Sequence, residues 1–322
     1  MPRQHVDPVS RDLRRRIRAR IGALRLSRVS VKTQARYVEA LRAFEVWAGL
    51  AGRARIGTTE ELDAVAASYI EALWAEGESR GYVGDLLSAL QWALQRRRIL
   101  SGSWELFRTW SLLELPVRAP PLPALVCCAL AGYALEHAQL GLAAVLLAAF
   151  DGMLRTTEYL TLSSSQCVVA SGQVLLLLPL TKSGQRHGGA ESVVVQDPQA
   201  VQLLAHVCAS AHFCRRPHVP LVDMRPQTFR KWLRNACAEL GVSELKLLPY
   251  SFRRGGATLK YSLGMPLREL LMLGRWESSR TAQIYITEAA LILQNLALSE
   301  QVRALLHRYV SVLVHFLSIH AA

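Results

Sequence analysis

The chain has 322 residues, enough for two domains with buried cores, and its hydrophobic content of 51% excludes a disordered protein. Its 38 lysines and arginines outnumber its 25 aspartates and glutamates, and the net charge of +13 predicts a polyanion such as nucleic acid as a partner. A GC-rich genome would produce a similar excess of arginine, so charge alone does not establish the partner.

Residues 1–28 form an arginine-rich arm with nine arginines. In LRRRIRARIGALRLSR the arginines alternate with leucine and isoleucine. Such a segment can lie along DNA phosphates, and amphipathic arginine-rich segments also act as targeting presequences. Both interpretations stay open, so the compartment does too. An arm that binds DNA would place the protein in a nucleus or nucleoid, and a presequence would place it in an organelle.

Residues 29–115 predict a compact unit of four helices. In the first helix, apolar residues recur every three to four positions and share one face. Those residues are Tyr37, Leu41, Phe44 and Trp47. Thr58 and Glu61 have the spacing of a capping box before the second helix. The patterns therefore predict one compact helical unit.

Two groups of side chains in this unit are predicted to contact DNA. Near the start of the first helix they are Lys32, Thr33 and Arg36. At the end of the third helix they are Arg96, Arg97 and Arg98. Cations at a helix C-terminus also suit the helix dipole, so a purely structural role for the second group is equally open.

Residues 116–123, PVRAPPLP, contain four prolines and predict a stiff linker between two domains. The next apolar stretch, residues 122–150, resembles a membrane span. Polar residues at 136, 137 and 139 divide it into pieces shorter than the roughly 20 residues that a span requires. Two buried helices are the better interpretation, and the apolar segment near residue 315 is also too short.

The remainder of residues 124–322 predicts a mainly α fold with a small antiparallel β-sheet. QVLLLLPL and ESVVVQ flank a polar, glycine-rich turn, which indicates a β-hairpin. Helical patterns follow, and the last helix is expected over residues 289–310. Cys208, His212, Cys214 and His218 cluster in sequence but match no common zinc spacing, so no metal and no cofactor is predicted.

Four short stretches carry groups suited to phosphodiester chemistry. GMLRTTEYLTL places Arg155 and Glu158 three residues apart, on one face of a helix. The hairpin turn PLTKSGQRHG carries Lys182, one of only five lysines in the chain. A lysine with a lowered pKa can give up a proton near neutral pH, whereas an arginine cannot. A surface ion pair and a solvated turn lysine are the alternative interpretations of these two stretches.

The other two stretches supply a second arginine and a nucleophile. SFRRGGAT contains Arg253 and Arg254, and LGRWESSRTAQIYI contains Trp276 and Tyr285. A phosphodiester attacked by a tyrosine hydroxyl passes through a pentacoordinate, doubly charged state, whose oxygens two guanidinium groups can clamp. A lysine can protonate the departing 5′ oxygen, so this chemistry needs no metal.

These four stretches, in this order, resemble the boxes of the tyrosine recombinases, the phage-integrase family. The resemblance covers residues from about 124 to 300. SVKTQARYVEALRAFEVWA resembles more weakly the family's SAM-like helical core-binding domain. The resemblance implies catalytic roles for Arg155, Lys182, Arg253 and Trp276, with Tyr285 as nucleophile.

The resemblance also implies supporting roles and one departure. Glu158 supports the first arginine, and Arg254 is expected to face the DNA backbone or an acid. Tyr250 stands where the family usually has histidine, three positions before Arg253. A tyrosine hydroxyl can still donate a hydrogen bond, so Tyr250 is included in the predicted catalytic set.

By this resemblance the protein is a DNA breaking-rejoining enzyme that closes as a clamp around duplex DNA. It recombines or integrates a mobile element through a 3′-phosphotyrosine intermediate, as a homotetramer on DNA and without a membrane. The segment after Tyr285 is expected to pack on a neighbouring protomer, so removing residues after about 300 would weaken assembly and spare DNA binding. The alternatives are a degenerate DNA-binding protein derived from a recombinase, a type IB-like topoisomerase, or a helical scaffold.

Overall fold

The computed structural model describes residues 10–21, 28–53, 55–96, 98–114, 118–178, 191–286 and 288–320. Contacts between Cα atoms divide the chain into two units, Met1–Val117 and Arg118–Ala322. The division falls inside the proline-rich segment, and each unit has a hydrophobic core of its own.

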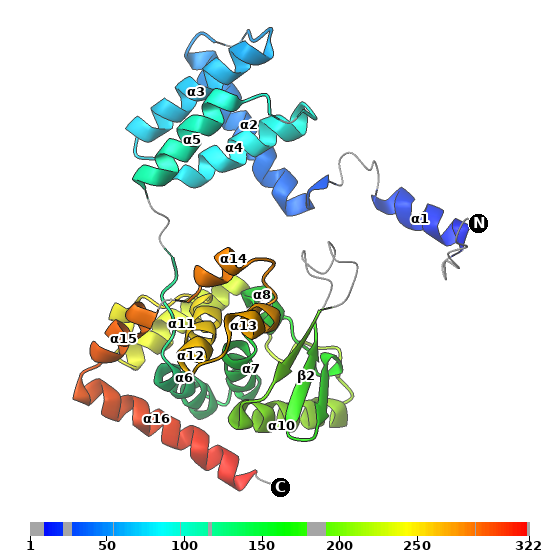
Figure 1. The fold of residues 1–322 in the computed structure, drawn as a ribbon. Helices are drawn as coiled ribbons and strands as arrows, with labels where there is room; N and C mark the ends of the chain where they lie inside the picture. The colour runs from blue at the N-terminus through cyan, green and yellow to red at the C-terminus, as the bar shows by residue number, and fades with distance from the viewer. Residues whose placement is uncertain are drawn as a thin grey trace. The chain divides into compact units, whose positions relative to one another are not determined.

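The first unit is helical throughout its described part (Figure 1). Its helices are α1 (Arg11–Ile21), α2 (Val31–Leu50), α3 (Thr59–Ala75), α4 (Arg80–Ala93) and α5 (Ser101–Leu113). Helix α2 packs on α4, and α3 packs on α5. The predicted capping box is confirmed, because Thr58 and Glu61 form one at α3. Ser30 caps α2 by accepting from the backbone N–H of Thr33.

The second unit is also mainly helical. Its α-helices are α6 (Ala124–Glu136), α7 (Leu140–Asp151), α8 (Thr156–Leu160), α10 (Pro198–Phe213), α11 (Pro226–Glu239), α12 (Ser251–Ser262), α13 (Leu267–Gly274), α14 (Ser279–Gln283), α15 (Glu288–Leu296) and α16 (Glu300–Ile319). Two short 3₁₀ turns cover Ser164–Gln166 and Ser243–Leu245. The predicted fold class is therefore confirmed.

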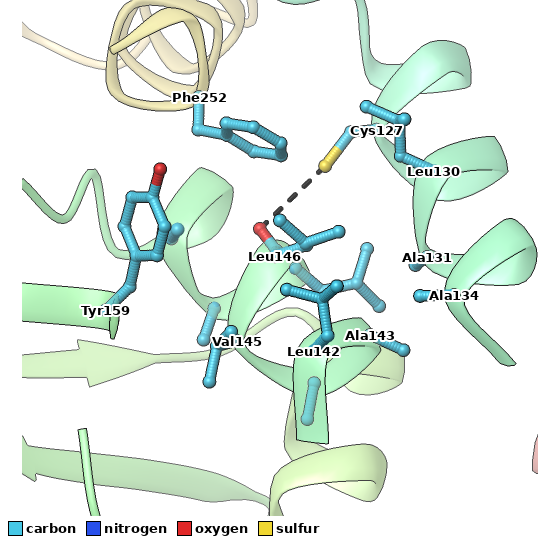
Figure 2. Close-up of a cluster of buried hydrophobic side chains, with 14 of the residues drawn as sticks. Cys127, Leu130, Ala131, Ala134, Leu142, Ala143, Val145, Leu146, Tyr159 and Phe252 are labelled. Atoms are coloured by element: carbon cyan, nitrogen blue, oxygen red, sulfur yellow. Dashed lines mark hydrogen bonds between the residues drawn. The ribbon is translucent and has the colours of Figure 1, made fainter. Parts of the chain in front are cut away.

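Helices α6 and α7 form the centre of this unit and confirm the two buried helices predicted for the apolar stretch. Figure 2 shows their contact, where the Cys127 thiol of α6 lies 3.9 Å from the carbonyl oxygen of Leu146 on α7. The rings of Tyr159 and Phe252 close the same cluster from α8 and α12. Helix α12, which carries the second arginine stretch, is thus anchored directly on the core.

One antiparallel sheet of three strands lies beside α10, in the order β1 (Cys167–Ala170), β2 (Gln173–Leu177) and β3 (Ser192–Val195). Strands β2 and β3 pair with Val174 opposite Val195, as the hairpin pattern predicts. Strand β1 was not predicted, because most of its residues are exposed and the segment lacks an alternating apolar pattern.

The C-terminal part differs from the single helix expected over residues 289–310. Ser299 caps a new helix by accepting from the N–H of Val302, so α15 and α16 are separate. Helix α16 packs on α6 within the same chain, so closely that a Cβ on Gly132 would lie 1.9 Å from the Tyr309 carbonyl oxygen. Its apolar face completes the core of its own unit, and the expected contact of the segment beyond residue 300 with a neighbouring protomer stays a prediction.

By length and composition α16 also meets the criteria for a membrane span. Core helices meet the same criteria, and one such helix is weak evidence. Its residues Leu306, Leu313 and Leu317 are buried in the hydrophobic core, so one face of the helix packs within its own unit.

Candidate functional site

The first arginine stretch forms a tight turn after α7. Arg155 occupies the N-cap of α8, where its backbone N–H donates to Glu158 Oε2 at 2.8 Å and its Nη1 donates to Glu158 Oε1 at 2.6 Å. The same Nη1 lies 3.5 Å from Glu191 Oε2 at the start of the last strand. Burial opposes the charge of Arg155, but the two carboxylates outweigh it and raise the pKa of its guanidinium.

The second arginine stretch begins α12, where two glycines allow close packing. A Cβ on Gly255 would lie 2.2 Å from the Leu122 carbonyl oxygen, and one on Gly256 would lie 1.9 Å from the Phe150 carbonyl oxygen. The glycines therefore seat the first turn of α12 against the core. That placement turns Arg253 inward, and its side chain is almost fully buried.

Arg253 is held by backbone carbonyls from two other segments. Its Nη1 donates to the Met153 carbonyl and its Nη2 to the Gly274 carbonyl, each at 2.5 Å. Burial lowers the pKa of this guanidinium. The guanidinium carbon lies 4.8 Å from the ring centroid of Trp276 and 5.5 Å from that of Tyr285, which places a cation against both aromatic faces.

Tyr285 follows α14 and is half-buried in the same cluster. Its hydroxyl lies 2.5 Å from the hydroxyl of Tyr250, and its ring centroid lies 4.8 Å from that of Trp276. Thr258 of α12 donates to its backbone carbonyl at 3.1 Å. Burial and the hydrogen bond with Tyr285 raise the pKa of Tyr250 to about 12, so Tyr250 stays protonated at physiological pH.

The second unit therefore brings together most of the residues predicted for catalysis. Arg155, Tyr250, Arg253, Trp276 and Tyr285 surround one site. The predicted Lys182 lies outside the described residues. Arg254 is buried in α12, and burial together with nearby Arg118 lowers the pKa of its guanidinium, while its expected place at the DNA backbone or beside an acid stays a prediction.

Sequence reasoning missed Arg275, which lies between Gly274 and Trp276. Its Nη2 donates to Glu158 Oε2 at 2.7 Å, and its Nε lies 3.6 Å from Glu191 Oε2. Its side chain is 7% exposed, against 30% for Arg155. Burial lowers the pKa of Arg275 to about 10, against the opposing effect of the Glu158 carboxylate. No signal in the sequence separates this arginine from the many others.

The backbone at Arg275 is unusual. Arg275 ends α13 with a φ of 55°, in the left-handed region that costs a side-chain-bearing residue about 1–2 kcal/mol and normally takes glycine. The adjacent Gly274 serves another purpose, because a Cβ there would lie 2.1 Å from the folded-back ring of Trp276. The turn therefore places an arginine and a tryptophan side by side at the edge of the site.

The residues predicted to contact DNA from the first unit come from α2 and from the segment after α4. Lys32 and Arg36 are exposed on α2, and Arg36 pairs with Asp85 of α4. Thr33 is half-buried beside Ser30, with the two hydroxyl oxygens 2.9 Å apart. After α4, Arg96 and Arg98 are exposed, whereas Arg97 lies outside the described residues.

A metal site was weighed for the histidines and cysteines after residue 207. Within the described ranges of the chain, no group of three or more histidine, cysteine, aspartate or glutamate side chains is arranged to hold a metal ion.

Comparison with known proteins identifies the class. A model of the phage integrase family matches residues 129–291, half of the chain and the whole span from Arg155 to Tyr285. The integrase of the transposon Tn1549, solved with transposon right-end DNA, superimposes with a TM-score of 0.57 at 13% identity, over 88% of this chain and 98% of that one. The fold is that of a tyrosine recombinase catalytic domain. The chain belongs to the phage integrase family.

Two further solved structures are similar at lower scores. The XerA recombinase covers 84% of this chain and 93% of its own, with a TM-score of 0.45 and 16% identity. The XerH site-specific recombinase, bound to its difH substrate, covers 69% of this chain and 66% of its own, with a TM-score of 0.48 and 14% identity. No curated protein sequence matches the chain.

Proposed function

We propose that the protein cleaves and rejoins DNA strands through a covalent bond between Tyr285 and a 3′ phosphate. The family and the fold support site-specific recombination or integration of DNA. The observation that carries the proposal is the Tyr285 hydroxyl, which lies against Tyr250 while its ring faces the Arg253 guanidinium. A nucleophile, a fixed cation and a hydroxyl partner thus meet at one site.

The chemistry follows from these positions. The Tyr285 oxygen attacks phosphorus, the bond from phosphorus to the 5′ oxygen breaks, and the phosphate remains on tyrosine as a diester. Charge accumulates on the non-bridging oxygens, and the guanidinium groups of Arg155 and Arg253 stabilise it. A 5′ hydroxyl from the same or a second strand reverses the step, so no external energy source is needed.

Tyr250 takes the place of the histidine that is usual in the family. Because its phenol stays protonated at physiological pH, it can donate a hydrogen bond to a phosphate oxygen and accept one from the Tyr285 hydroxyl. Lys182 is the proposed acid for the departing 5′ oxygen. An ammonium suits the role of general acid better than a guanidinium, because a lysine can give up its proton near neutral pH and an arginine cannot.

The first unit is proposed to contact duplex DNA through the exposed side chains at the start of α2 and after α4. Both groups are basic, and the chain as a whole carries a net charge of +13. The integrase of Tn1549 was solved with DNA, which supports a similar use of this chain. The active assembly is proposed to be a homotetramer on two DNA sites.

The function is tested with negatively supercoiled plasmid, without metal or ATP, quenched in detergent. The protein is expected to relax the plasmid and to form a covalent adduct, and Tyr285→Phe is expected to lose both by roughly 10³-fold or more. Tyr261→Phe, which alters an exposed tyrosine of α12, is the matched control and should behave as wild type.

Adduct formation is also tested on an end-labelled library of DNA sites. If no adduct forms on the plasmid or on the library, and DNA binding is still weakened by salt, the protein is a degenerate DNA-binding protein. Relaxation by a protein that stays monomeric on DNA would support a type IB-like topoisomerase. Mass measurement of the crosslinked protein–DNA complex separates that outcome from a tetrameric recombinase.

Tyr250 is expected to contribute through its hydroxyl. Tyr250→Phe removes the hydroxyl that faces Tyr285 and should slow adduct formation on the order of 10²-fold. Tyr250→His should cleave at close to the wild-type rate, but its rate should change with pH near 6.5. A histidine titrates there, and a tyrosine with a pKa of about 12 does not.

The measurement is the ratio of cleavage rates between Tyr250→His and wild type from pH 6 to pH 9. A ratio that stays constant over this range, or a Tyr250→Phe variant as fast as wild type, would contradict a role for this hydroxyl.

A further inference from the structure

Three arginines and two glutamates gather at the edge of the site. Arg155 pairs with both Glu158 and Glu191, and Arg275 approaches the same two carboxylates with different nitrogen atoms. Arg253 adds a third guanidinium close enough to influence both other arginines. The two carboxylates are thus shared between two arginines of unequal exposure.

We infer that Arg275 is a positioning residue that neutralises Glu158 and Glu191 from inside the protein and so leaves Arg155 able to bind the scissile phosphate. The inference rests on the proposed strand-cleavage function. Arg275 is nearly buried; its Nη2 donates to Glu158, and its Nε lies within ion-pair distance of Glu191. Arg155 keeps 30% of its side chain exposed and is therefore the member of the pair that an incoming phosphate can reach.

The geometry explains why an arginine occupies this position. A guanidinium spreads its charge over three nitrogens, so it can donate to Glu158 at 2.7 Å while another nitrogen stays within ion-pair distance of Glu191, at 3.6 Å. The residue also adopts the left-handed conformation that favours glycine.

Arg275 also links three parts of the site that are distant in sequence. Glu158 lies in α8, beside Arg155. Glu191 lies at the start of β3, where its carbonyl accepts from the N–H of Leu178, and it directly follows residues 179–190, which include Lys182. Trp276, next in sequence to Arg275, packs its ring on Tyr285. One buried guanidinium therefore fixes the base of the hairpin, the first arginine turn and the tryptophan relative to one another.

The test is a charge-rescue series measured on DNA that is already bound. Arg275→Gln leaves Arg155 between two carboxylates and should slow strand cleavage about 10²-fold, with DNA affinity within about threefold of wild type. Glu191→Gln alone should change cleavage by less than about threefold. The double variant Arg275→Gln/Glu191→Gln leaves one carboxylate, Glu158, paired with Arg155. It should cleave at least about tenfold faster than Arg275→Gln alone. Arg268→Gln, an exposed arginine on the same helix, is the control.

A second measurement reports on the site without catalysis. A fluorinated tyrosine at position 285 gives a ¹⁹F resonance that Arg275→Gln should shift and the double variant should return towards wild type. Cleavage at the wild-type rate in Arg275→Gln, or a double variant in which the two losses simply multiply, would overturn the inference.

The two proposals fail separately. If wild type forms no adduct, the proposed function fails, and the ¹⁹F resonance then decides the inference alone. A resonance that moves with Arg275→Gln and returns in the double variant supports it, and an unmoved resonance refutes it.

Discussion

Replacing Arg253 by lysine is expected to abolish covalent adduct formation while the protein stays folded and bound to DNA. The guanidinium donates through two nitrogens to the carbonyls of Met153 and Gly274, and it lies over the rings of Trp276 and Tyr285. A lysine keeps the charge but has one nitrogen, which cannot reach both carbonyls and still face a phosphate. Loss of a transition-state clamp of this kind is expected to cost on the order of 10³-fold in cleavage rate.

The experiment compares Arg253→Lys with Arg268→Lys, which makes the same change at an exposed position of α13. Adduct formation, DNA affinity at two salt concentrations and thermal unfolding are measured for both. One carbonyl left without its donor is expected to destabilise the lysine variant by about 1–3 kcal/mol, so the cleavage assay is run well below its melting temperature. A lysine variant that cleaves within threefold of wild type would refute the role of Arg253.

Deleting residues 300–322 is expected to unfold the second unit, and not merely to weaken assembly. Helix α16 buries Leu306, Leu313 and Leu317 in the main core, and its backbone at Tyr309 is in contact with Gly132 of α6. Each buried leucine contributes about 1.5–3 kcal/mol, and a typical domain is stable by only about 5–15 kcal/mol. Losing the burial of three leucines is therefore enough to remove most of that stability.

Two adjacent point variants test the same idea without truncation. Leu313→Ala should lower the free energy of unfolding by about 2–5 kcal/mol, because Leu313 is fully buried. Val314→Ala, at a position that is half exposed, should lower it by less than about 1 kcal/mol. A truncated protein that melts at the wild-type temperature and binds DNA would support the alternative, in which the segment serves assembly only.

Most elements of the fold have local causes and were predictable. The apolar runs at α6 and α7 are long enough for helices and too short for a bilayer, and the apolar runs of β2 and β3 lie on either side of a polar, glycine-rich segment. Strand β1 and the break between α15 and α16 were not predicted. The first depends on pairing with β2, and the second depends on one capping serine inside a long helical pattern.

Chain order and residue chemistry alone were sufficient to predict the family, the fold class and the residues gathered around Tyr285. The four short stretches that carry these residues are defined by residue type and spacing, and both can be read directly from the sequence. Three-dimensional packing was needed to show that the Tyr250 and Tyr285 hydroxyls meet, that Arg254 is buried, and that Arg275 shares its two carboxylates with Arg155. The reason is physical. These contacts join residues 35 and 117 positions apart, and only the close packing of α12 and the turn after α13 brings their side chains within hydrogen-bond distance.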